Sequence, residues 1–229
     1  MRTRLQRDVE KLKGMVISLG TLVEERYRMA VKGLEVPTNV DLAEKVYNSD
    51  LEIDKKEVEL EEEGLKILAL HQPVADDLRY IVAVLKMNND LERIGDLAVN
   101  IAGRAIQLRE QGHTRLVFDY GPMCRSTGEM LKKSLDALIS LDLDLAYEVC
   151  VQDDEVDSMK RAIQAQFASE LSHGSISIES LTNQFLISRH LERIADHATN
   201  IAEDVIYFIT GTIHRHRGRK TDKEPERSS

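Results

Sequence analysis

LERIGDLAVNIA, residues 91–102, and LERIADHATNIA, residues 191–202, are two copies of one pattern, and nine of their twelve positions are identical. In each copy the apolar residues recur three and four positions apart, which is the spacing of one buried face of an α-helix. The Glu and Asp of each copy are four positions apart and share a second helical face. The repeat predicts two equivalent helices, each with a buried face and an acidic face.

The composition is typical of a helical protein without a nucleic-acid surface. The 229 residues are 31% charged and only 4% aromatic, with no Trp and four Pro. The formal net charge is −9, whereas binding to nucleic-acid phosphates requires a concentrated basic surface. We therefore expect an all-α protein and no nucleic-acid partner.

The cysteines and the N-terminus predict a cytoplasmic protein. Cys124 and Cys150 lack a CxxC spacing, and no signal-peptide pattern is present, so reduced thiols are expected. The longest apolar run, residues 80–85, is too short to span a membrane. The basic tail at residues 214–229 allows peripheral proximity to an anionic membrane surface, although a disordered end is the simpler expectation.

Apolar spacing along the chain predicts six helices with coiled-coil-like packing. The first carries a heptad-like stripe from Leu5 to Ala30. Pro73 suits the first position of the third helix, after a turn at His71 and Gln72. The predicted helices span about 5–36, 39–70, 73–111, 121–141, 142–172 and 176–210.

A second repeat extends the duplication to whole bundles. DLAEKVYNSDLEID, residues 41–54, matches DLAYEVCVQDDEVD, residues 144–157, at seven of fourteen positions with an offset of 103. The chain is therefore predicted to form two tandem antiparallel three-helix bundles, residues 1–112 and 113–213, related by pseudo-two-fold symmetry. A polar tail follows at residues 214–229.

Four carboxylates of each repeat are predicted to meet where its last two helices fold back on each other. With the first turn near residue 71.5, position n faces about position 143 − n, and the turn near residue 174.5 acts likewise in the second repeat. The two sets are Asp50, Asp54, Glu92 and Asp96, and Asp153, Asp157, Glu192 and Asp196.

Converging carboxylates repel unless protons, arginine side chains or a bound cation compensate their charge. An all-oxygen site suits Mg²⁺, Mn²⁺, Ca²⁺ or iron rather than Zn²⁺. Metal binding is therefore the hypothesis for both sets. The alternative is that Arg93 and Arg193 neutralise them on a solvated helix surface.

The sequence offers little for catalysis. A di-iron centre needs Glu-x-x-His motifs in the core, but Glu110-x-x-His113 and Glu170-x-x-His173 lie at predicted helix ends. His197 is expected to be a surface or hydrogen-bonded histidine. We expect no enzyme. A carboxylate-bridged metal-storage or metalloenzyme bundle and a metal-free helical adaptor are the alternatives.

The twin LERI-x-D motifs, QPVADDLR at 72–79 and the D-x-x-x-D segments at 50–54 and 153–157 resemble the PhoU family of phosphate-signalling accessory proteins. The likeness runs from Leu5 to about Gly211. It implies two three-helix bundles, a regulator rather than an enzyme and, in some members, multinuclear metal clusters. By position, those clusters fall on the eight carboxylates named above.

The resemblance also implies partners. Family members act at the cytoplasmic side of the phosphate ABC transporter and its sensor histidine kinase, restrain phosphate uptake and keep the starvation response off when phosphate is plentiful. We also expect a homodimer. QPVADDLR has no counterpart in the second half, so Gln72 and an exposed Arg79 are predicted to contribute to partner contact. The alternative is a helix start at which Asp76 and Asp77 favour the helix dipole.

Overall fold

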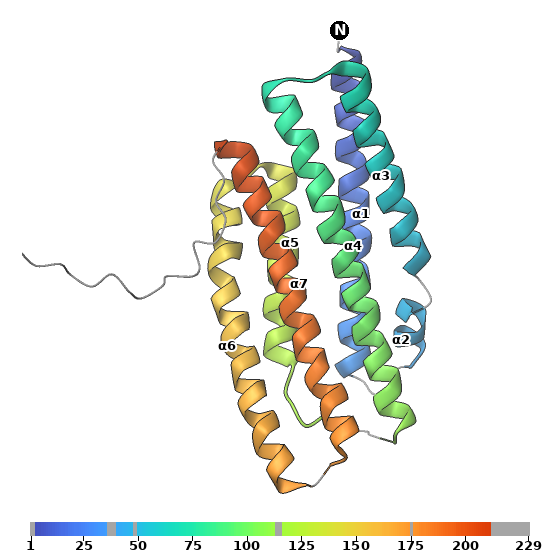
Figure 1. The fold of residues 1–229 in the computed structure, drawn as a ribbon, viewed down its shortest axis with the longest axis vertical. Coiled ribbons are helices and arrows are strands. Elements are labelled where there is room, and N and C mark those ends of the chain that lie inside the picture. Colours follow the sequence, from blue (N-terminus) through green and yellow to red (C-terminus); the bar gives the residue numbers. More distant parts are fainter. Residues whose placement is uncertain (1–2, 36–39, 48–49, 113–115, 175, 212–229) are drawn as a thin grey trace, which may run out of the picture.

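The protein, seen here in a computed structural model, is a set of long helices joined by short links (Figure 1). The structure describes residues 3–35, 40–47, 50–112, 116–174 and 176–211, except the side chains of residues 35, 40, 41 and 50. The predicted polar tail, residues 214–229, lies outside the described residues. None of the described helices is both long enough and apolar enough to cross a membrane.

The described residues form α1 (Arg4–Glu35), α2 (Val40–Tyr47), α3 (Asp50–His71), α4 (Ala75–Glu110), α5 (Gly121–Ser140), α6 (Leu143–His173) and α7 (Ile178–Thr210). The predicted all-α class is confirmed. The second predicted helix corresponds to α2 and α3 together, and the other five predicted helices each correspond to one helix of the structure.

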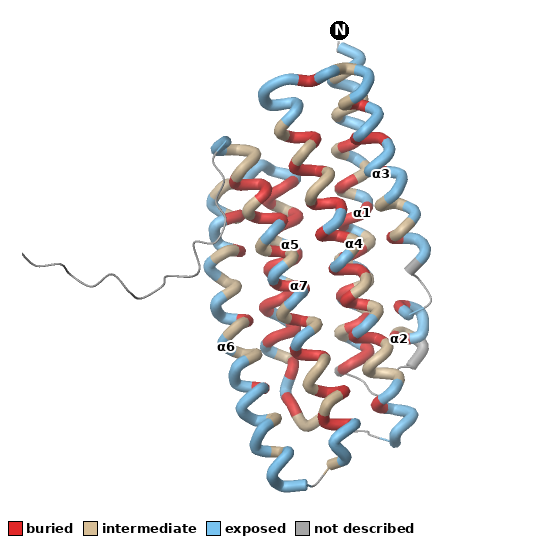
Figure 2. The backbone as a smooth tube through the Cα atoms, in the orientation of Figure 1, coloured by how far each residue is buried: buried red, intermediate tan, exposed pale blue. Residues whose placement is uncertain are grey.

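Two bundles lie side by side (Figure 1). In the first, α1, α3 and α4 pack together, with α2 against α1 and α4; in the second, α5, α6 and α7 pack together. The bundles meet chiefly along α4 and α7, and also between α1 and α5. The sides of α4 and α7 that face the interior are largely buried (Figure 2). We call the line of contact between α4 and α7 the seam.

The apolar positions of the LERI repeat are core residues in both copies. They are fully buried at Leu91 and Leu191, Ile94 and Ile194, Ala98 and Ala198, Ile101 and Ile201, and Ala102 and Ala202. Full burial of a Leu or Ile side chain stabilises a fold by about 1.5–3 kcal/mol. The repeated Glu, Arg and Asp lie on the other face of the same helices, which therefore points away from the core.

Local side-chain chemistry sets the helix ends in the second bundle. The Asp142 carboxylate accepts a hydrogen bond from the Leu145 amide at 3.0 Å, and Ser177 Oγ accepts one from the Ser180 amide at 3.2 Å. Both are N-caps, which satisfy amides that a helix leaves unpaired. Gly174 ends α6 with a φ of 63°, a left-handed conformation that glycine adopts without steric cost.

The turn between α3 and α4 differs from the prediction. Pro73 was expected to begin the helix, but α4 begins at Ala75, after Val74 in an extended conformation. Gln72 and Ala75 have φ values of 45° and 49°, a region that costs residues other than glycine about 1–2 kcal/mol each. The prediction was wrong because Pro73 belongs to this strained link and not to the first helical turn.

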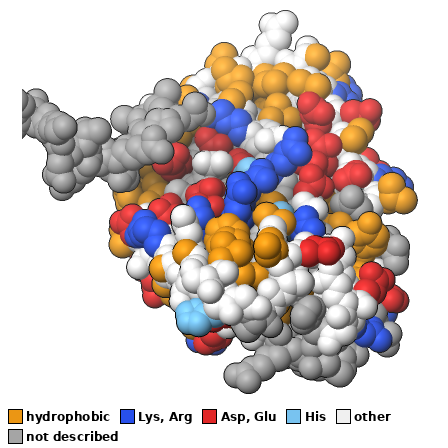
Figure 3. Space-filling view, turned by 60° about the horizontal axis from the view of Figure 1, so that its bottom comes forward, with side chains coloured by type: hydrophobic (Ala, Val, Ile, Leu, Met, Phe, Trp, Pro, Cys, Tyr) orange, Lys and Arg blue, Asp and Glu red, His pale blue; other side chains and the backbone are white. Residues whose placement is uncertain are grey.

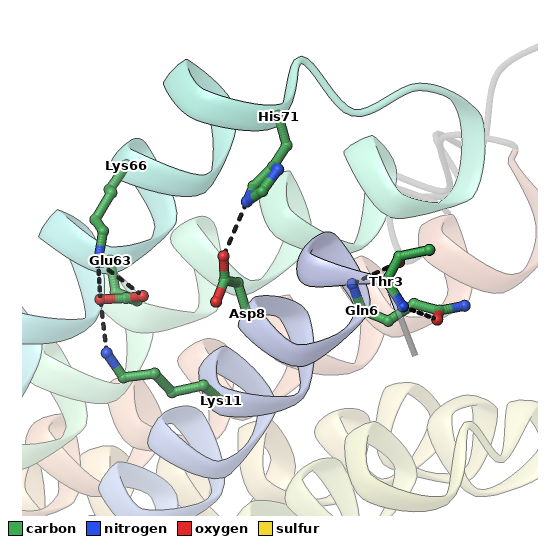
Figure 4. A network of polar contacts seen from close by, with 7 residues as sticks. All are labelled: Thr3, Gln6, Asp8, Lys11, Glu63, Lys66 and His71. Carbon is green, nitrogen blue, oxygen red and sulfur yellow. Dashed lines mark hydrogen bonds and ion pairs between the residues drawn. The ribbon is translucent and has the colours of Figure 1, made fainter. Parts of the chain in front are cut away.

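Polar contacts join α1 to α3 beside the same turn (Figure 4). His71 Nε2 lies 2.8 Å from Asp8 Oδ2, and Lys11 Nζ lies 2.8 Å from Glu63 Oε2. The hydrogen bond from His71 holds the pKa of Asp8 below its usual value. The end of α3 is thus fixed against the start of α1, which positions the link to α4.

Candidate functional site

The second repeat brings its four predicted carboxylates together between α6 and α7. Burial, and then the negative charges of Glu192, Asp153 and Asp157, raise the pKa of Asp196 to about 6. Burial, and then the charge of Asp157, also raise the pKa of Asp153. The four side chains therefore repel one another, as expected for groups that the helical hairpin places at one level.

Two basic side chains of α6 offset part of this negative charge. Lys160 Nζ forms an ion pair with Glu192 Oε1, and Arg161 Nη1 lies 3.6 Å from Asp157 Oδ2. Arg193, which the alternative to metal binding assigned to this set, forms no ion pair with another described residue. The compensating cations come from α6 instead.

The first repeat gathers a similar set between α3 and α4. Burial, and then the charge of Asp96, raise the pKa of Glu92. Asp54 and Glu57 of α3 add to this repulsion, while Arg93 opposes it. Asp50 is the first residue of α3, but its side chain lies outside the described part of the chain.

Arg93 bridges the two carboxylates of its own helix. Its Nε atom lies 3.3 Å from Glu92 Oε2, and its Nη1 atom lies 3.5 Å from Asp96 Oδ2. The neutralising role considered for this arginine is therefore present in the first repeat. Because the Arg93 side chain is 52% exposed, solvent weakens these ion pairs.

Glu57 is a member of the first cluster that the sequence prediction missed. Burial, and then the charges of Glu61 and Asp54, raise its pKa. Asn88 Nδ2 of α4 donates to the backbone oxygen of Glu57 at 2.9 Å and to its Oε1 atom at 3.3 Å. The offset of 103 already contained a signal, because it aligns Glu57 with Lys160. One repeat thus has a carboxylate where the other has an ammonium group.

The register of the first hairpin is shifted from the prediction. The relation 143 − n places Asp54 opposite residue 89, whereas its charge acts on Glu92. The hydrogen bonds between Glu57 and Asn88 show a shift in the same direction. The cause is the late start of α4, which moves the centre of the turn from 71.5 to residue 73.

The donor chemistry of both clusters suits a hard cation, because every predicted ligand is a carboxylate. Among the described side chains, however, no three Asp, Glu, His or Cys residues are arranged to hold one ion. In this conformation Arg93 and Lys160 offset part of the negative charge. Metal binding at the eight positions therefore stays a prediction.

The histidines considered as ligands lie elsewhere. His173 Nδ1 is 2.7 Å from the Ser169 carbonyl oxygen, at the end of its own helix. His197 Nδ1 donates to Asp90 Oδ1 at 2.7 Å across the seam, which agrees with the expectation of a hydrogen-bonded side chain. His113 lies outside the described residues.

The turn predicted for partner contact is partly accessible. Gln72 is exposed, and Val74 is an exposed apolar side chain at 75%. Arg79 was expected to be exposed, but its side chain is only 40% exposed. It pairs with Asp76, and its guanidinium group lies against Gly211 at the end of α7. Arg79 is held in this position because the two bundles meet there.

Fold and site together define an internally duplicated helical-bundle protein with one carboxylate cluster in each repeat. A family model described as the PhoU domain matches residues 16–105 and again residues 122–205. One match falls in each bundle. The chain belongs to the PhoU family.

Relatives and solved structures resemble the whole chain. The phosphate-specific transport system accessory protein PhoU homolog 1 of Thermotoga maritima is 38% identical, over 90% of this chain and 89% of that protein. The crystal structure of PhoU from Pseudomonas aeruginosa has a TM-score of 0.87 at 36% identity, covering 91% of this chain and all of the other. The phosphate transport system regulatory protein PhoU of Streptococcus pneumoniae has a TM-score of 0.84 at 28% identity, covering 92% and 99%.

Proposed function

We propose that this protein is a regulator of phosphate uptake and of phosphate-starvation signalling. It would act as a cytoplasmic homodimer with the phosphate ABC transporter and a sensor histidine kinase, and not as an enzyme. The observation that carries the proposal is family membership in both repeats, at 38% identity to a phosphate transport accessory protein over 90% of the chain.

We further propose that the two carboxylate clusters bind Mg²⁺, Mn²⁺, Ca²⁺ or iron. The support is the charge repulsion at Asp196, Asp153 and Glu92, which a cation would relieve. Asp54, Glu57, Glu92 and Asp96 would hold a cation in the first repeat, with Asp50 as a further candidate, and Asp153, Asp157, Glu192 and Asp196 in the second. The cation would supply positive charge that holds the two helices of each hairpin together.

Elemental analysis of purified protein never exposed to chelator tests this proposal. We expect about one or more metal equivalents per bundle, lost in the variant Glu92→Gln, Asp96→Asn, Glu192→Gln and Asp196→Asn. A control variant changes four exposed carboxylates outside the clusters: Glu62→Gln, Asp77→Asn, Glu110→Gln and Glu155→Gln. It has the same net charge and should keep its metal.

A metal-free helical adaptor is the competing function. The ion pairs of Arg93 and Lys160 favour it, because they already offset part of the cluster charge. If neither the native protein nor the control contains metal, even after incubation with Mg²⁺, Mn²⁺ or iron, the adaptor is correct and the metal proposal fails. A redox-active metal with turnover would instead indicate the metalloenzyme.

The link between α3 and α4 is the surface we propose for partner contact. Val74→Asp should weaken association with the purified transporter by about tenfold, or about 1.4 kcal/mol, because an exposed apolar contact would be lost. Ile178→Asp is the matched control, since Ile178 is 72% exposed at the corresponding link of the second bundle. Equal affinities of the two variants in a surface-binding assay would argue against a docking role for Gln72 and its neighbours.

A further inference from the structure

One histidine of the seam lacks the partners that buried polar groups normally have. Both ring nitrogens of His190 are shielded from solvent, and neither has a hydrogen-bond partner among the described residues. Most buried polar groups in proteins are hydrogen-bonded, so an exception calls for an explanation. His197, two turns further along α7, is by contrast bonded to Asp90.

The charges that act on His190 are all positive. Burial, and then the guanidinium groups of Arg104, Arg193 and Arg189, lower its pKa to about 4. The ring is therefore neutral at pH 7 and has one N–H group to donate. The three arginines come from both sides of the seam, Arg104 from α4 and the other two from α7.

These arginines are uncompensated in an otherwise acidic protein. Within the described part of the chain, none of the three forms an ion pair. Arg104 Nη1 instead donates to Asn183 Oδ1 at 3.0 Å and to Gln107 Oε1 at 2.9 Å, which holds the side chain across the seam. Figure 3 shows Lys and Arg side chains in a band beside histidine on one face, with Asp and Glu to either side.

We propose that the seam between α4 and α7 binds a phosphate-class oxyanion between Arg104 and Arg193, with His190 donating a hydrogen bond to it. Guanidinium groups offer paired N–H donors that match phosphate oxygens. The anion would neutralise the arginines and give the His190 ring an acceptor. Its source is either free inorganic phosphate or the phosphate of a lipid headgroup. The site goes beyond the proposed regulation and requires no cation at the carboxylate clusters.

Calorimetric titration of the full chain with inorganic phosphate at low salt tests the site. The variant Arg104→Gln with Arg193→Gln should bind at least about tenfold more weakly than the native protein. The control Arg109→Gln with Arg125→Gln removes two exposed arginines outside the group and should bind as the native protein does. Circular dichroism verifies the folds, and Arg193→Gln alone serves if the Arg104 variant unfolds.

A second measurement follows His190 itself. Phosphate should shift the imidazole ¹⁵N resonances of His190 in the native protein and leave those of His197 unchanged. His190→Leu should weaken phosphate binding while keeping the helical signal, since the donated hydrogen bond is lost.

Vesicle sedimentation separates the two sources of the phosphate group. The site would be assigned to a lipid headgroup by two results together. Inorganic phosphate would bind only weakly, and the protein would bind phosphatidylglycerol vesicles, but not phosphatidylcholine vesicles, in a way that depends on the two arginines. The proposal is overturned if two variants bind inorganic phosphate equally well and also bind the vesicles equally well. The two variants are Arg104→Gln with Arg193→Gln and the control Arg109→Gln with Arg125→Gln. Metal content and transporter affinity would stay as in the native protein in that case, so failure here is distinct from failure of the proposed function.

Discussion

Leu191→Ala is expected to lower the free energy of unfolding by about 3 kcal/mol. Leu191 is fully buried at the first position of the second LERI motif, so truncation leaves a cavity in the packed core. Leu91→Ala should cost the same to within about 1 kcal/mol, because Leu91 is equally buried in the first repeat. Urea unfolding followed by circular dichroism measures both changes.

The control for this pair is Leu51→Ala. Leu51 is 80% exposed on α3, so its truncation should change the free energy of unfolding by less than about 0.5 kcal/mol. A loss below about 1 kcal/mol for Leu191→Ala would mean that the second motif is not a core element. Unequal losses at Leu91 and Leu191 would mean that the repeats are packed differently.

Asp90→Ala should destabilise the protein by about 2–3 kcal/mol, because it removes the acceptor of two hydrogen bonds within the seam. His197 Nδ1 donates to Asp90 Oδ1 at 2.7 Å, and Asn200 Nδ2 donates to the same oxygen at 3.1 Å. Asp90 is buried, so water replaces these bonds poorly. Thermal unfolding at neutral pH is the measurement.

A double-mutant cycle assigns this effect to the pair. His197→Leu introduces the residue type that the first repeat has at the equivalent position, Leu97. If the two side chains stabilise each other, Asp90→Ala should cost about 1 kcal/mol less in the His197→Leu background. Additive losses would show that Asp90 does not stabilise the protein through His197.

The LERI repeats alone predicted much of the fold. Alternating faces of a helix follow from residue spacing, and Leu91, Ile94 and their counterparts are buried as that spacing requires. The acidic face followed from the same spacing, and Asp153, Asp157, Glu192 and Asp196 do lie within reach of each other's charge. Local periodicity therefore determined the two helix faces, and the fold-back of α6 on α7 determined that the four carboxylates meet.

Sequence spacing was insufficient where the conformation depended on a single link or on docking between bundles. Pro73 suits a helix start, but the strained link delays α4 to Ala75 and shifts the hairpin register. Lys160 and Glu57 were recognisable only by aligning the repeats beyond their matching positions. Both ring nitrogens of His190 are buried without a partner among the described residues, and no local sequence pattern specifies this, because burial depends on tertiary packing.

The seam between α4 and α7 also determines which halves of the protein can associate with each other. At an offset of 100, Asp90 corresponds to His190, and Leu97 corresponds to His197. Two copies of the N-terminal half in this arrangement would oppose Asp90 to Leu97, and two copies of the C-terminal half would oppose His190 to His197. Only unlike halves unite Asp90 with His197. A gene split between the bundles would therefore encode two fragments that assemble as a heterodimer. Self-association of either fragment would be disfavoured, because it would place Asp90 against Leu97 or His190 against His197.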